Sequence, residues 1–145
     1  MPGPFVYAHA ELLVGSAHVS DIAGEETGQC VSLVKRYIQL LQNVSSQTWK
    51  KGVNVIETLK NGGTIAKGTA IATFTGERFM SRHGHAAFYL GHESYPDGSI
   101  RIYVVEQYLR SDGVQKRLLQ NRGKDSSGDY IDRSNNGEAF SVILL

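Results

Sequence analysis

The chain has 145 residues, of which 41% are apolar, so it is long enough for one domain and too short for two ordinary ones. Fifteen Lys and Arg against fourteen Asp and Glu leave a formal net charge of +1, and such a balance disfavours a dedicated nucleic-acid binder. The apolar runs fall far short of the roughly 18 residues that a membrane helix needs, so we expect no association with membranes.

The first half of the chain favours helices. Apolar residues between Phe5 and Val14 follow a helical spacing that stops at Gly15, which predicts a short helix. A polar, Gly-bounded stretch from Gly24 to Gln29 comes before the clearest helical pattern, which runs from Cys30 to Asn43. From Thr48 to Gly63 the pattern is mixed, and the type of element stays open.

The second half favours strands. Three short runs rich in β-branched and aromatic residues predict consecutive strands at Thr69–Phe74, His85–Leu90 and Ser99–Glu106. A Pro-Asp-Gly turn signal between the second and third runs predicts an antiparallel hairpin. A further helix within Gly113–Asn121 and a last strand within Glu138–Leu145 complete the expectation of one α+β domain over residues 1–145.

Cys30 is the single cysteine, which excludes an internal disulfide and a multi-thiolate zinc site. As the first residue of the predicted helix, its thiol would feel the positive end of the helix dipole, which lowers a thiol pKa and favours a nucleophile. Its helical stripe continues through Val34, Ile38 and Leu41, so this face is expected to pack on the sheet. The alternative is a small buried core residue, as most single cysteines are.

Of the five histidines, only His85 stands at the head of an apolar strand, where an imidazole is held more rigidly than on a loop. Alternation places it on one face with the small Ala87, which would leave room for a helix. His83 lies two residues earlier, on the loop. A metal site built from His83 and His85 is the weaker reading, because only His92 or Glu93 would offer a third ligand.

An imidazole that acts as a base needs an acceptor on its other nitrogen. If the partner strand of the hairpin runs antiparallel, its end near Glu106 and Gln107 returns beside His85. Either residue supplies a suitable side chain, and the alternative is an ordinary polar strand end.

Three segments in this order resemble the CHAP and NlpC-type papain-like cysteine peptidases that cut bacterial peptidoglycan. They are Gly28-Gln29-Cys30 opening a helix, Gly84 to Leu90 on a strand, and Ile102 to Gln107 on the next strand. The resemblance implies the nucleophile helix packed on a small antiparallel sheet. It assigns Cys30 as nucleophile, His85 as base and Glu106 as third member, with Gln107 as the alternative.

The resemblance also implies a hydrolase that needs no cofactor and cleaves an amide of the peptidoglycan stem peptide. Gln29 would add a donor for the oxyanion or serve only as a helix-entry residue. Trp49 and His83 are further candidates for contacts with the substrate. The sequence holds no loop of closely spaced acidic residues for calcium.

The first residues lack the basic and apolar pattern of a secretory leader, so we expect synthesis in the cytoplasm and export by a non-classical route. A bare catalytic domain of this size further resembles the small amidase effectors of type VI secretion. That resemblance implies an antibacterial monomer that acts in the periplasm of a target bacterium, and an immunity protein that protects the producer. The alternatives are a protein-modifying deamidase or acyltransferase toxin, and a non-enzymatic binding module with a buried thiol.

Overall fold

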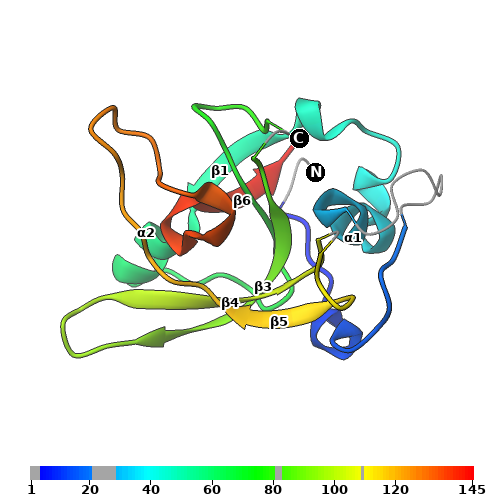
Figure 1. Cartoon of the computed structure of the whole chain (residues 1–145), viewed down its shortest axis with the longest axis horizontal. Helices are drawn as coiled ribbons and strands as arrows, with labels where there is room; N and C mark the ends of the chain where they lie inside the picture. Colours follow the sequence, from blue (N-terminus) through cyan, green and yellow to red (C-terminus); the bar gives the residue numbers. More distant parts are fainter. Residues whose placement is uncertain (1–3, 21–28, 81–82, 109) are drawn as a thin grey trace.

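The computed structural model describes residues 4–20, 29–80, 83–108 and 110–145 (Figure 1). Within these ranges the centre of the fold is a six-stranded sheet in the order β1-β6-β2-β3-β4-β5, and each neighbouring pair is antiparallel. The strands are β1 (Lys50–Asn54), β2 (Ala70–Thr73), β3 (Ala86–Ser94), β4 (Ile100–Glu106), β5 (Gln115–Leu118) and β6 (Phe140–Leu144). The α-helices are α1 (Cys30–Tyr37) and α2 (Val55–Lys60). Short 3-10 helices are η1 (Ala10–Leu13), η2 (Gln39–Leu41), η3 (Ser46–Thr48), η4 (Arg133–Asn135) and η5 (Gly137–Ala139).

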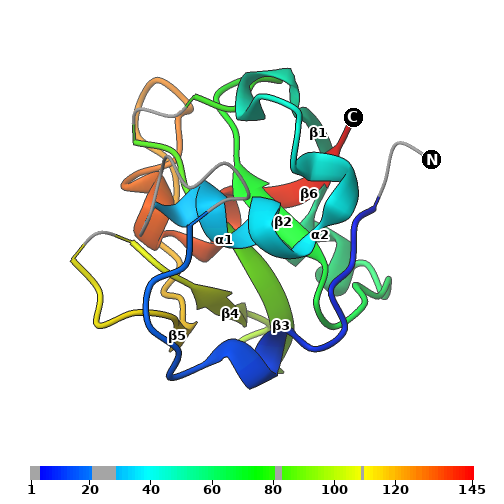
Figure 2. The ribbon, with the colours of Figure 1, turned by 90° about the vertical axis from the view of Figure 1, so that its right-hand side faces the viewer.

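The central strands are buried on both faces. In β3, Ala86, Phe88 and Leu90 pack into the cluster that holds α1, whereas Ala87 and Tyr89 pack into the cluster that holds α2. This follows from the two-residue repeat of a strand, which sends consecutive side chains to opposite faces. Figures 1 and 2 show α1 and α2 on opposite sides of the sheet. The helix expected to approach over Ala87 is α2, whereas α1 covers the Ala86 face.

The helix that begins at Cys30 packs on the sheet as its stripe predicted. Val34, Ile38 and Leu41 are all buried in one cluster with the α1 face of β3. The α-helix ends at Tyr37 and does not continue to Asn43, because Ile38 has extended dihedrals (φ −111°, ψ 103°). The chain then re-forms a turn in η2, which buries Leu41 separately.

The predicted helix over Phe5–Val14 is reduced to η1. The carbonyl of Phe5 accepts a hydrogen bond from Ala70 N at 2.8 Å, and Val6 bridges Thr69. These bonds hold the start of the segment extended along the sheet. Pairing with another element has therefore outweighed a weak local helical preference.

The predicted helix within Gly113–Asn121 was wrong. Residues Gln115–Leu118 form the edge strand β5, and Glu106 lies opposite Gln115 in its pairing with β4. Val114 and Leu119, on either side of the strand, are buried. The strand therefore carries Gln115 and Arg117 along the end of β4.

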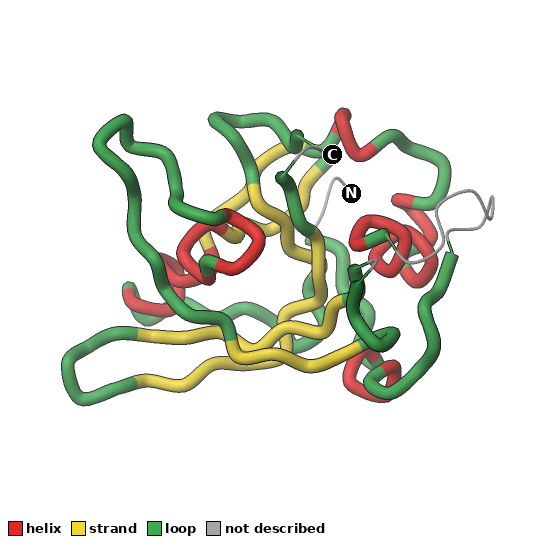
Figure 3. Tube along the Cα trace, viewed as in Figure 1, coloured by secondary structure: helices red, strands yellow, loops and turns green. Residues whose placement is uncertain are grey.

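The remaining strand predictions were confirmed as β2, β3, β4 and β6, and so was the hairpin of β3 and β4. The segment left open, Thr48–Gly63, contains the end of η3, then β1, then α2, whose start is capped by Asn54 through its side-chain oxygen (3.0 Å to Glu57 N). Figure 3 shows that the connection from β5 to η4 is mostly loop. In the polar, Gly-bounded stretch before Cys30, residues 24–28 lie outside the described residues. None of the helices described could span a bilayer.

Candidate active site

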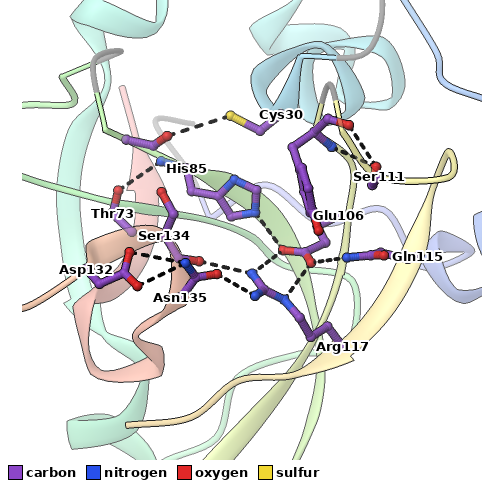
Figure 4. Close-up of polar contacts among 12 residues, drawn as sticks. Cys30, Thr73, His85, Glu106, Ser111, Gln115, Arg117, Asp132, Ser134 and Asn135 are labelled. Atoms are coloured by element: carbon purple, nitrogen blue, oxygen red, sulfur yellow. Dashed lines mark hydrogen bonds and ion pairs between the residues drawn. The ribbon is translucent and has the colours of Figure 1, made fainter. Parts of the chain in front are cut away.

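Cys30 and His85 meet at the end of the sheet. Cys30 is the first residue of α1, and His85 comes immediately before β3 (Figure 4). Both side chains line a cleft of about 370 Å³ together with Gln29, Gly84, Tyr108, Arg117, Ser134 and Asn135. Cys30 is half-buried and stands outside both apolar clusters. Its thiol therefore faces a cleft and is not packed as a core residue.

Gly84 allows the close approach that builds this end of the cleft. A Cβ atom at Gly84 would lie 2.1 Å from the carbonyl oxygen of Met80, a distance that real Cβ atoms do not reach. Without a side chain there, the chain brings the carbonyl oxygen of Gly84 to 3.9 Å from the Cys30 Sγ. His85 follows directly, and its backbone N–H donates to Thr73 Oγ1 at 3.0 Å.

The surroundings of Cys30 favour the thiolate. Burial by itself raises the pKa of the thiol, but hydrogen bonding and charge from His85 lower it, as do the backbone N–H groups of Ala86 and Val31. The balance leaves the pKa of Cys30 below its ordinary value. Gln29, the residue before α1, makes no side-chain cap to the helix, and the Val31 N–H in the first turn bonds to the sulfur.

The imidazole of His85 lies between Cys30 and Glu106. Its Nε2 is 2.7 Å from Glu106 Oε1, which leaves Nδ1 as the nitrogen that faces Cys30. Burial lowers the pKa of His85, yet the hydrogen bonds and charges of Cys30 and Glu106 outweigh burial and raise this pKa to about 9. The two pKa shifts together favour a thiolate beside an imidazolium over a neutral thiol beside a neutral imidazole.

Glu106 is fully buried and sits between two cationic groups. Besides His85, it faces Arg117, whose Nη2 donates to Oε1 at 2.9 Å and whose Nε forms an ion pair with Oε2 at 2.6 Å. Gln115 Nε2 also donates to Oε2 at 2.7 Å. Burial raises the pKa of Glu106, but His85 and then Arg117 lower it below its ordinary value. The carboxylate is therefore held ionised.

Arg117 and Gln115 are members of the site that the sequence reasoning missed. Arg117 further donates to Asn135 Oδ1 at 2.6 Å and to the carbonyl oxygen of Ser134 at 3.1 Å (Figure 4). Had residues 115–118 been predicted as a strand paired with β4, both side chains would have been expected near Glu106. The segment was instead expected to be a helix.

Gln107 occupies a different place from Glu106. Its Nε2 donates to the carbonyl oxygens of Gln29 (2.8 Å) and Val19 (2.9 Å), and its Oε1 accepts from Val19 N (2.9 Å). These bonds use the amide fully, and the His85 ring bonds to Glu106 instead. Gln107 thus ties the end of β4 to the residue before Cys30.

The other predicted contact residues are scattered. Gln29 is exposed and lines the cleft, and His83 is exposed beside it in a left-handed conformation (φ 62°). Trp49 is only 2% exposed and packs on Phe79, so its expected contact with substrate is not supported: the ring belongs to the core. The described residues bring together no group of three possible metal ligands, and both ring nitrogens of His85 already have partners.

Comparison with known proteins places this chain in a family. Residues 9–143 match the model of the family described as Domesticated amidase effector 2. The chain belongs to this family. It is 35% identical to the Type VI secretion amidase effector 2 protein of Salmonella typhi, over 97% of this chain and 98% of that one. It is 29% identical to Domesticated amidase effector 2 of Ixodes scapularis, over the same shares.

A solved structure agrees with these matches. The chain resembles Type 6 secretion amidase effector 2 (Tae2) with a TM-score of 0.77 and 32% identity, over 99% of this chain and 96% of that one. The α+β papain-like fold and the expected similarity to small type VI amidase effectors are therefore confirmed. CHAP and NlpC peptidases are a related superfamily.

The thiolate–imidazolium pair predicts fast alkylation of Cys30 at neutral pH. Iodoacetamide should label the native protein at pH 7 about 10-fold faster than it labels a His85→Ala variant, whose thiol would ionise nearer an ordinary pKa. The rate is measured by mass spectrometry of the intact protein. His83→Ala is the matched control and should label like the wild type. Equal rates in wild type and His85→Ala would contradict the ion pair.

Replacing Glu106 should move the pH at which the imidazolium is lost. Glu106 helps to raise the pKa of His85 to about 9. In Glu106→Gln this pKa should be lower, so the loss of activity at basic pH should begin about one pH unit below that of the wild type. The change also leaves Arg117 beside a neutral amide, so the free energy of unfolding should drop by about 3 kcal/mol in urea denaturation. Glu57→Gln, an exposed carboxylate on α2, should alter neither quantity. If activity at basic pH were lost at the same pH in Glu106→Gln as in the wild type, the role assigned to Glu106 would be contradicted.

Proposed function

We propose that this chain is a peptidoglycan-degrading cysteine amidase in which residues 1–145 act as one catalytic domain. The observation that carries the proposal is the order of contacts from the Cys30 thiol through His85 to a buried, ionised Glu106, opening into a cleft. Such an order is what nucleophilic acyl transfer requires, and the chain belongs to a family of amidase effectors.

In the first half-reaction the Cys30 thiolate attacks the carbonyl carbon of a stem-peptide amide and forms a C–S bond. The backbone N–H of Cys30, at the uncapped start of α1, and the side-chain amide of Gln29 would donate to the developing oxyanion. His85 then gives the proton on Nδ1 to the leaving amine, and the C–N bond breaks. An acyl-enzyme and a free amine result.

In the second half-reaction water enters the cleft and neutral His85 removes its proton. Attack on the thioester breaks the C–S bond and returns the thiolate and the imidazolium, with a carboxylic acid as product. Glu106 fixes Nε2 and stabilises the imidazolium in both steps, so we assign it as the third member. Gln107 acts as a positioning residue for the start of α1.

A protein-modifying toxin would use the same pair of Cys30 and His85, so the substrate class separates the two hypotheses. The amidase hypothesis is favoured because the Salmonella typhi relative and the similar solved structure are both type VI secretion amidase effectors. A non-enzymatic binding module is disfavoured because the Cys30 thiol lies in a cleft, beside the imidazole of His85, whose pKa is raised.

The deciding experiment is mass spectrometry of purified peptidoglycan digested with the wild type and with Cys30→Ala. New muropeptides should appear only with the wild type, because no other described side chain in the cleft is a comparable nucleophile, and their masses identify the cleaved amide. Cys30→Ala should retain the melting temperature. A well-folded Cys30→Ala protein that still cleaves would overturn the mechanism, and wild type without products would favour the protein-modifying toxin.

We further propose that the enzyme acts in the periplasm of a target bacterium and that its producer carries an immunity protein which blocks the cleft. The family relationship to type VI effectors supports both. Expression with an added periplasmic leader should lyse a Gram-negative host, whereas cytoplasmic expression and periplasmic Cys30→Ala should not. Lysis from the cytoplasm alone would contradict this location.

A further inference from the structure

A second groove adjoins the catalytic cleft. It has a volume of about 270 Å³ and is lined by His83, Tyr130, Asp132, Arg133 and Ser134. Ser134 also lines the catalytic cleft, and its hydroxyl is 3.4 Å from the carbonyl oxygen of His83. The groove and the cleft therefore share a wall, and a ligand that leaves the cleft past Ser134 enters the groove.

The charged side chains that line this groove differ in the partners that the described residues supply. Both carboxylate oxygens of Asp132 accept from Asn135 Nδ2 at 3.1 Å, and Arg122 Nε lies 3.9 Å from one of them. Lys124 lies over the ring of Tyr130, with its Nζ 4.7 Å from the ring centroid. The side chain of half-buried Arg133 has no hydrogen bond or ion pair within the described ranges of the chain. Within the described ranges, the Arg133 guanidinium is thus in ion-pair contact with no carboxylate, although Asp132 lines the same groove.

An unpaired guanidinium in a groove is suited to a carboxylate. Its planar array of N–H groups matches the two oxygens of a carboxylate, and partial removal from water strengthens such a bond. Stem peptides of peptidoglycan supply this group next to the amides that join their residues. A γ-linked glutamate leaves its α-carboxylate free, and a diamino acid such as diaminopimelate carries a second carboxylate at its far end.

We propose that Arg133 binds a free carboxylate of the stem peptide and so selects the substrate beside the scissile amide; this rests on the proposed function. Arg133 directly precedes Ser134, which lines both the groove and the catalytic cleft, so a carboxylate bound in the groove lies next to the cleft.

The test uses three synthetic stem peptides: one with all carboxylates free, one amidated at glutamate and one amidated at the diamino acid. For the free peptide, Arg133→Gln should raise KM about 10-fold or more with kcat unchanged, as expected for loss of a hydrogen bond to a charged group. For the wild type, KM should rise by the same factor on one of the two amidated peptides, namely the one in which amidation blocks the carboxylate that Arg133 binds. Arg133→Gln should not distinguish that peptide from the free one.

Matched variants separate the proposal from a general effect of charge. Arg36→Gln, an exposed cation at the end of α1, should leave all three KM values unchanged. Arg133→Lys keeps the charge and should restore part of the preference for the free peptide. An unchanged KM, or the same loss on all three peptides, would overturn the proposal while leaving the amidase function intact. A wild type that cleaves none of the peptides would overturn the proposed function itself.

Discussion

The fully buried carboxylate of Glu106 is the constraint on which the rest of the site depends. An ionised carboxylate is costly to remove from water unless opposite charges and hydrogen bonds replace the water. Here His85 occupies Oε1, Arg117 reaches both oxygens and Gln115 occupies Oε2. Those partners come from the start of β3 and from β5, so the charge is tolerated only if both strands flank β4 in the observed register.

The same arrangement explains why the thiol ionises. Thiolate, imidazolium, carboxylate and guanidinium alternate in sign from Cys30 to Arg117, so each charge has an opposite neighbour in a region of low dielectric. Burial opposes both the thiolate and the imidazolium, and the neighbouring charges outweigh burial in each case. Glu106 acts on Cys30 only through the ring of His85, which is why its effect is on positioning and pKa and not on bond formation.

The sequence predicted Cys30, His85 and Glu106 because helix start, strand head and hairpin order are local signals. It left open whether Glu106 or Gln107 is the partner of His85. Consecutive residues at a strand end point to opposite sides, and the pattern does not say which side holds the histidine. Arg117 was missed because β5 is a short edge strand without clear alternation, so that pairing with β4 decides its conformation. Trp49 was a candidate for contact with the substrate, yet its ring packs on Phe79. Such long-range packing leaves no trace in the local pattern.

One segment supports both catalysis and the adjoining groove. Arg117, which holds Glu106, also donates to Asn135 Oδ1 and to the Ser134 carbonyl, and Asn135 in turn binds Asp132. These bonds fix η4, the short helix that carries Arg133, to the guanidinium behind the catalytic carboxylate. An edge strand and a loop are ordinarily the less stable parts of a fold. Here buried charge joins them, so the proposed substrate contact in the groove and the proposed general acid His85 depend on a single network.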